Sequence, residues 1–240
     1  LPMTADASAA LPTLTSMVKE MIQEEPSITS KVRERWARVE EEHRRQRVEW
    51  GRQAEAARGL KPIDFAWLSH EINAVLDNKT IIVNEFDLVA AQVDLTETGS
   101  YFSGSTASAL GFALGAALGA KLASPDRTVI ACVGDGSYIF GCPVAAHWVS
   151  RAYGLPVLFV VFNNRGYRAV KSSIWRLLPE GWSVRTGRFV GTDLDPSPDY
   201  VSVVGSSGGY GERVEDPEGI RPALVRALEV VRKGRQALLD

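Results

Sequence analysis

The sequence predicts an α/β fold built on a mostly parallel sheet with helices on both faces. From about residue 61 onward, short apolar runs rich in Val, Ile and Phe alternate with longer segments of helical periodicity. Strands that alternate with helices in this way are typical of a parallel sheet covered on both sides. Such sheets bind ligands outside the carboxyl ends of their strands, where the strand order reverses. We therefore expect functional residues directly after the strands.

The elements of this part can be assigned in order along the chain. Strands are expected at 80–85, 127–135, 156–164, within 209–215 and at 236–240. Helices are expected at 64–76, 106–123, 143–154 and 217–234, and a further helix opens in 197–208. The stretch at 167–188 is rich in Arg and Trp, and we expect a lid or substrate loop there.

The first 60 residues are expected to lie outside this sheet. Residues 1–25 carry apolar side chains at helical spacing and are expected to be the remnant of a preceding domain. Residues 26–60 are dense in charge, with Val32, Trp36 and Val39 on a narrow apolar stripe, which indicates a long linker helix against a partner surface. A helix that binds nucleic acid is the alternative, but glutamates are interspersed among its basic residues. The sheet domain would then occupy 61–240.

Composition excludes several classes of protein. The 240 residues carry a net charge of −2 and are 45% apolar, which suits one large domain or a domain with part of another. There is no basic field of the kind that binds nucleic acid. The weakly polar run at 107–123 is too short and too rich in glycine to span a bilayer, and Lys121 interrupts it. Cys132 and Cys142 lack metal-ligand spacing, so we expect reduced thiols in a cytoplasmic protein.

Two polar motifs follow two of the predicted strands. GDGS at 134–137 ends the strand at 127–135, and NNRGY at 163–167 ends the strand at 156–164. Either motif alone is typical of a turn. Because the carboxyl ends of parallel strands emerge at the same edge of a sheet, the two motifs together indicate a functional site.

The residue types of this site suit a magnesium ion that carries a diphosphate. Asp135 offers a carboxylate, Asn164 an amide oxygen and Gly166 a backbone carbonyl. Mg²⁺ prefers such oxygen ligands, and one carboxylate is too little charge to hold it without phosphate oxygens. Gly136 and Ser137 offer backbone N–H groups at a predicted helix start, where phosphates bind.

These motifs resemble the signature of thiamine-diphosphate enzymes. From about residue 60 to 240, the chain is similar to the C-terminal diphosphate-binding (PP) domain of the acetolactate synthase, benzoylformate decarboxylase and pyruvate decarboxylase group. The resemblance implies that thiamine diphosphate is the cofactor and that Asp135, Asn164 and the carbonyl of Gly166 bind Mg²⁺. The residues that it places at the cofactor in these motifs are Gly134, Gly136, Ser137, Asn164 and Tyr167.

A second segment, at 104–121, also matches this family. Leu110 stands where the family places a bulky apolar residue that wedges beneath the cofactor and forces a bent conformation. The backbone carbonyl of Ser108 would accept a hydrogen bond from the exocyclic amine of the aminopyrimidine. Without the resemblance, Leu110 would be interpreted as ordinary core packing.

Two other polar features receive no role from the resemblance. Asn84-Glu85-Phe86, at the end of the first strand, stands where acetolactate synthases commonly have Gly-Gln-His in a loop that contacts the diphosphate. Glu85 would repel a diphosphate there unless it faces away or is bonded by backbone N–H groups. His147 lies on a predicted helix beside Trp148, and packing explains it better than catalysis.

The resemblance also implies that the active site is shared. In the family, a Glu that activates the cofactor lies in a separate pyrimidine-binding (PYR) domain, so the catalytic residues are expected outside this chain. We expect the Mg-diphosphate-binding half of a 2-oxo acid decarboxylase or carboligase similar to acetolactate synthase, a C–C lyase or transferase. It would pair with a PYR domain of another chain or of an upstream part. The assembly would be a homo- or hetero-oligomer, a dimer or tetramer, with no nucleic acid and no membrane.

Two alternatives stay open. A non-catalytic or regulatory subunit could retain the fold and bind thiamine diphosphate, although the intact Leu110, Asp135 and Asn164 argue against a decayed site. A nicotinamide-binding Rossmann domain is weaker, because no GxGxxG motif opens a helix after the first strand.

Overall fold

The computed structural model describes residues 4–85, 87–104 and 109–240. The chain divides into two compact units, 1–50 and 51–240. This boundary falls within a helix, so the expected division into 1–25, 26–60 and 61–240 stays a prediction. None of the described helices combines the length and the apolar character needed to cross a bilayer.

The first unit consists of helices. α1 spans Ala7–Glu24, and α2 spans Pro26–Ala56, continuing past the boundary between the units. The Asp6 carboxylate caps α1 by accepting the Ser8 N–H at 2.8 Å. Apolar side chains at helical spacing are exposed, namely Leu11, Leu14, Met17, Val18 and Met21 in α1 and Val32, Trp36 and Val39 in α2. The two helices thus form where the periodicity predicts them.

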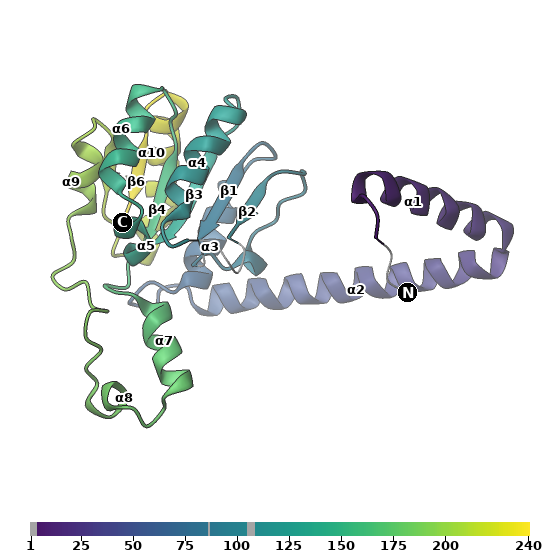
Figure 1. Cartoon of the computed structure of the whole chain (residues 1–240), viewed down its shortest axis with the longest axis horizontal. Coiled ribbons are helices and arrows are strands. Elements are labelled where there is room, and N and C mark those ends of the chain that lie inside the picture. Colours follow the sequence, from purple (N-terminus) through teal and green to yellow (C-terminus); the bar gives the residue numbers. More distant parts are fainter. Residues whose placement is uncertain (1–3, 86, 105–108) are drawn as a thin grey trace. The chain divides into compact units, whose positions relative to one another are not determined.

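The second unit is built on a sheet in which every paired neighbour runs parallel. Its order across the described residues is β2-β1-β3-β4-β6-β5, and Figure 1 shows the run from β2 to β6. The strands are β1 (Ile81–Glu85), β2 (Tyr101–Ser103), β3 (Val129–Gly134), β4 (Leu158–Phe162), β5 (Tyr210–Glu212) and β6 (Ala237–Leu239). The expected parallel α/β sheet is confirmed.

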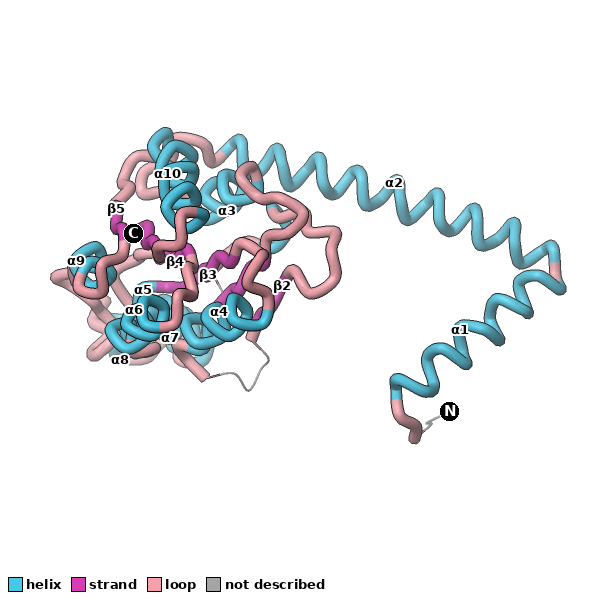
Figure 2. Tube along the Cα trace, turned by 90° about the horizontal axis from the view of Figure 1, so that it is seen from above, coloured by secondary structure: helices cyan, strands magenta, loops and turns pink. Residues whose placement is uncertain are grey.

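Helices cover both faces of this sheet, as Figure 2 shows. One face carries α3 (Phe65–Asn73) and α10 (Ile220–Arg232). The other carries α4 (Phe112–Ala123), α6 (Pro143–Ala152) and α9 (Tyr200–Gly205). Strand β3 supplies both cores, because successive side chains point to opposite faces. Ile130 and Cys132 pack under α3 and α10, whereas Val129, Ala131 and Val133 pack under α4 and α6.

Shorter elements complete the unit. They are α5 (Asp135–Phe140), α7 (Arg168–Leu177), α8 (Trp182–Thr186) and the 3-10 turns η1 (Ala90–Gln92) and η2 (Pro217–Gly219). Two of them change what the sequence predicted, because the expected loop at 167–188 contains α7 and α8. Trp175 on α7 packs edge-to-face on Phe189 at 5.3 Å, so α7 contacts the chain that follows α8.

Strand β2 was not expected. Its three residues, Tyr101–Ser103, are exposed and lack the buried apolar run that identifies the central strands. Pairing with β1 forms it, since Ile82 lies opposite Tyr101 and Asn84 opposite Ser103. An edge strand of this kind depends on its neighbour rather than on its own composition.

Candidate functional site

The polar motifs meet at the carboxyl ends of β1, β3 and β4. Strand β3 pairs with β1 on one side and β4 on the other, with Gly134 opposite Phe162. The chain passes from β1 to β2 on one side and then crosses to β3, so the order reverses between β1 and β3. This is the switch point at which parallel α/β sheets bind ligands.

Asp135 joins the two motifs directly. It follows β3 as the first residue of α5 and is only 1% exposed. Its Oδ1 accepts the Gly136 N–H at 2.9 Å, and its Oδ2 accepts the Gly166 N–H at 2.8 Å. Burial raises the pKa of the Asp135 carboxyl, and these backbone N–H groups oppose that rise. The GDGS and NNRGY motifs are therefore in contact, as the adjacent strand ends predicted.

The turn that carries Asn164 and Gly166 is held from outside the sheet. Tyr167 donates its backbone N–H to the Thr192 carbonyl at 2.8 Å, and an isolated antiparallel bridge joins Gly166 to Asp193. The Gly166 carbonyl accepts the Arg168 N–H at 2.9 Å. The Asn164 side chain is exposed beside this turn.

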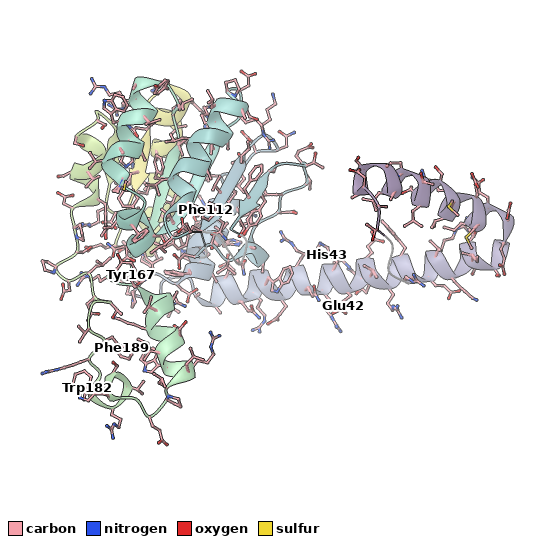
Figure 3. The ribbon with its side chains drawn as sticks, in the orientation of Figure 1. Glu42, His43, Phe112, Tyr167, Trp182 and Phe189 are labelled. Carbon is pink, nitrogen blue, oxygen red and sulfur yellow. The ribbon has the colours of Figure 1, made fainter. Side chains whose placement is uncertain are left out.

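The glycines of the first motif are in close contact with two side chains. A Cβ at Gly136 would lie 2.6 Å from the Tyr167 ring, and a Cβ at Gly134 would collide with the Asp87 carboxylate. Figure 3 shows Tyr167 at this end of the sheet, where α7 begins. Ser137 is mostly buried behind them. A side chain at either position would therefore displace Asp87 or Tyr167 from this edge.

The start of α4 lies at the same edge. Gly111 precedes the helix with φ +86°, and a Cβ there would lie 2.5 Å from the Gly141 Cα. Leu110 before it is 39% exposed, so ordinary core packing does not explain that residue. Ser108, whose carbonyl was expected to bind the cofactor, lies outside the described residues.

Glu85 at the end of β1 is bonded by backbone N–H groups, the condition under which its charge is compatible with a nearby diphosphate. Its side chain is 1% exposed. Oε1 accepts the Gly111 N–H at 2.6 Å and Oε2 accepts the Ala113 N–H at 2.9 Å. Glu85 therefore faces α4 and is bonded there.

Asp87 is the site residue that sequence reasoning missed. Burial raises its pKa to about 6, the Asp135 and Glu85 carboxylates add to the rise, and Arg168 opposes it. The signal that could have found it is the third acid at this edge, two residues after Glu85 and directly past a predicted strand.

His147 belongs to the core rather than to this edge. Its Nε2 is 2.6 Å from the Tyr138 hydroxyl, and its Nδ1 is 2.7 Å from the Gln236 Oε1. The Gln236 amide returns a hydrogen bond to the His147 carbonyl at 2.9 Å. Burial lowers the pKa of His147. This closed network agrees with a packing role.

The described residues contain no group of three or more His, Cys, Asp or Glu side chains placed to hold a metal ion together. Asp135 could contribute one carboxylate to a cation, with amide and carbonyl oxygens of the 164–166 turn beside it. Such a set suits a hard cation whose remaining ligands come from a bound anion. The fold and this edge thus define a class, a parallel α/β domain with two polar motifs in contact at its switch point.

The chain belongs to the family described as thiamine pyrophosphate enzyme, C-terminal TPP binding domain, whose model matches residues 85–240. It is 26% identical over 241 residues to the acetolactate synthase isozyme 3 large subunit of Escherichia coli, covering all of this chain and 40% of that protein. It is 42% identical over 80 residues to the benzoylformate decarboxylase of Pseudomonas aeruginosa, covering 33% of this chain and 15% of that protein.

The chain is also similar to a solved structure of a thiamine diphosphate-dependent enzyme. The thiamine diphosphate-dependent 4-hydroxybenzoylformate decarboxylase of Rhodococcus jostii RHA1 matches with a TM-score of 0.64 and 33% identity, over 76% of this chain and 32% of that chain. The chain thus spans 40% or less of the length of each of these three proteins.

Proposed function

We propose that this chain is the Mg-diphosphate-binding part of a thiamine-diphosphate-dependent enzyme that breaks or forms a C–C bond next to a carbonyl. Its substrate would be a 2-oxo acid, and the reaction a decarboxylation or a carboligation similar to that of acetolactate synthase. The observation that carries the proposal is the contact between Asp135 and Gly166, which brings two polar motifs to one edge of the sheet.

The residues at this edge would divide the work of binding. Asp135, Asn164 and the Gly166 carbonyl would hold Mg²⁺, and the Ser137 N–H and hydroxyl would contact the diphosphate. The N–H groups that Asp135 accepts orient its carboxylate, as is usual for metal-binding carboxylates. Tyr167 would cover the diphosphate end over Gly136, and Leu110 would support the cofactor from below. When bound, thiamine diphosphate supplies an electron sink for the reacting carbon.

A partner domain would complete the site. Exposed apolar side chains lie on α4, α5 and α6, including Leu122, Phe140, Val144 and Trp148. A face of this kind is typical of a protein interface. We propose that a PYR domain, within an oligomer, brings the activating carboxylate to the cofactor.

The test uses the complete protein that carries this domain. Isothermal titration with thiamine diphosphate should show binding that depends on Mg²⁺ and is lost in EDTA. Asn164→Ala should weaken this binding at unchanged thermal stability, because the side chain is exposed. Asp216→Asn, at an exposed carboxylate near the far edge strand, is the matched control.

The reaction is tested separately by CO₂ release from a panel of 2-oxo acids. Tight Mg²⁺-dependent cofactor binding without turnover would favour a regulatory subunit. Binding that is equal with and without Mg²⁺ would contradict the proposed metal site.

A further inference from the structure

Glu85 supplies the start of α4 with a cap that its own sequence lacks. The N-cap residue of α4 is Gly111, which has no side chain to accept the free N–H groups of the first turn. Glu85, 26 residues earlier in the chain, accepts the Gly111 N–H at 2.6 Å and the Ala113 N–H at 2.9 Å. A residue of β1 therefore holds the first turn of a helix on the neighbouring layer.

The pleat of β1 explains why this carboxylate faces α4. Ile81 and Val83 pack in the core beneath α4 and α6, whereas Ile82 packs beneath α3 and α10. Residues two apart share a face of a strand, so Glu85 continues the α4 side. Glu85 thus follows two apolar residues on the same face of β1. Its side chain contacts backbone N–H donors, whereas theirs pack in the apolar core.

The chemistry of the two bonds favours a carboxylate over other side chains. Both partners are donors, and each binds a different oxygen. Carboxylate oxygens only accept, whereas a glutamine would turn its NH₂ toward one of the two N–H groups. Negative charge is also favourable at a helix N-terminus.

The start of α4 is fixed from a second side as well. Gly111 has φ +86° and packs backbone to backbone against Gly141, in the turn after α5. Gly111, the residue after Leu110, is therefore held both by Glu85 and by the turn that follows α5. A shift of Gly111 would move Leu110, which is exposed at the carboxyl edge.

We infer that Glu85 is a positioning residue for the cofactor. By holding Gly111 and Ala113, it sets Leu110 at the height that thiamine diphosphate requires above the sheet. The inference rests on the proposed function, because it assumes that the cofactor binds over Leu110. Because both Glu85 oxygens accept backbone N–H groups, its negative charge is compensated there and would be compatible with a diphosphate nearby.

The first arm of the test needs no cofactor. Amide hydrogen exchange of the full chain is compared for wild type and Glu85→Gln. Hydrogen bonds to charged groups contribute enough that exchange over 109–116 should become about 10-fold faster. Exchange in α10 and β6 should not change. Asp216→Asn removes an exposed carboxylate that caps η2, after the edge strand β5, and should leave 109–116 unaffected.

The second arm measures thiamine diphosphate affinity with saturating Mg²⁺ in the complete protein. Glu85→Gln should weaken binding by about 10-fold, the equivalent of losing one bond to a charged acceptor. Glu85→Asp retains both oxygens with a shorter reach and should restore part of the affinity. If Glu85→Gln does not fold, the same measurements are made on Glu85→Asp.

The outcomes separate the two claims. Unchanged exchange at 109–116 in both variants would overturn the bond as a determinant of the α4 start. Faster exchange with unchanged affinity would overturn the positioning role. A wild-type protein that binds no thiamine diphosphate would overturn the proposed function, and the positioning role with it, while the exchange result would still support the bond to α4.

Discussion

Two regions of the second unit bury polar side chains beside the same sheet, but they satisfy them differently. Under α6, His147 bonds Tyr138 and Gln236, and every ring nitrogen has a partner. At the carboxyl edge, Asp87 and Asp135 lie close to each other, and burial raises the pKa of both. The first arrangement stabilises the fold, whereas the second costs stability and leaves acceptors for a ligand. Buried polar groups that lower the stability of the fold are typical of functional sites.

The largest stability effect should come from the closed network. His147→Ala leaves a cavity and removes partners from the Tyr138 hydroxyl and the Gln236 amide. Lost hydrogen bonds and a cavity together should reduce the free energy of unfolding by about 3–5 kcal/mol. Urea denaturation measures this change. A loss below about 1 kcal/mol in the free energy of unfolding would contradict the stabilising role that we assign to the His147 network.

The next largest effect should come from the backbone at the start of α4. Gly111→Ala places a Cβ against the Gly141 backbone at a φ of +86°, and neither feature can relax through a side chain. We expect a loss of about 2–3 kcal/mol in the free energy of unfolding. Gly115→Ala is the control, since nothing lies within 4 Å of its Cβ position. The same measurement should find that variant unchanged or more stable.

The smallest change in the free energy of unfolding should come from Asp87 at the carboxyl edge of the sheet, and it should be a gain rather than a loss. The pKa of Asp87 is raised to about 6, so the folded protein holds a proton that the unfolded chain releases above pH 4. This group thus makes the fold less stable as pH rises from 4 to 6, and the cost remains above pH 6. The full shift corresponds to about 3 kcal/mol, and solvent screens the partly exposed carboxylate, so Asp87→Asn should stabilise the metal-free protein by about 1–2 kcal/mol at pH 7. Thermal melting at pH 4 and pH 7 measures it, and equal shifts at both would contradict the account.

His147 should give the mirror image of this pH dependence. Its pKa is lowered by burial, so the unfolded chain takes up a proton that the folded protein resists. Stability from His147 is therefore present above about pH 6.5 and is lost as pH falls below that value. The two regions can thus be told apart by comparing pH profiles of the His147→Ala and Asp87→Asn proteins.

The fold could be predicted from the sequence wherever burial dictates composition. β3 and β4 are apolar runs that are buried throughout, and the segments around them alternate as a parallel sheet requires. Tyr101–Ser103 could not be found, because an exposed edge strand depends on β1. The helices α7 and α8 were missed because Arg and Trp content indicated a loop, whereas Trp175 packs on Phe189.

The candidate site was predictable in its motifs but not in its contacts. Asp135 and Gly166 could be placed together because adjacent parallel strands end at one edge. The acids of β1 could not be placed, since the sequence does not show that Glu85 reaches the N–H groups of α4. Asp87 was missed for a related reason. Its pKa is raised by burial first and then by the charges of Asp135 and Glu85, and only the fold creates these surroundings.

One paired measurement tests the central claim that the polar groups at the carboxyl edge of the sheet bind a ligand rather than stabilise the fold. Thiamine diphosphate binding with Mg²⁺ and urea denaturation are measured on the same preparations of wild type and Asp135→Asn. We expect affinity to fall by at least about 100-fold, beyond the effect typical of losing a residue that only supports a metal ligand. The free energy of unfolding should stay within about 1 kcal/mol of wild type, because removal of the buried charge offsets the Asn NH₂ group that would face one of the two backbone N–H groups. Unchanged affinity, with or without a loss of stability, would contradict the account.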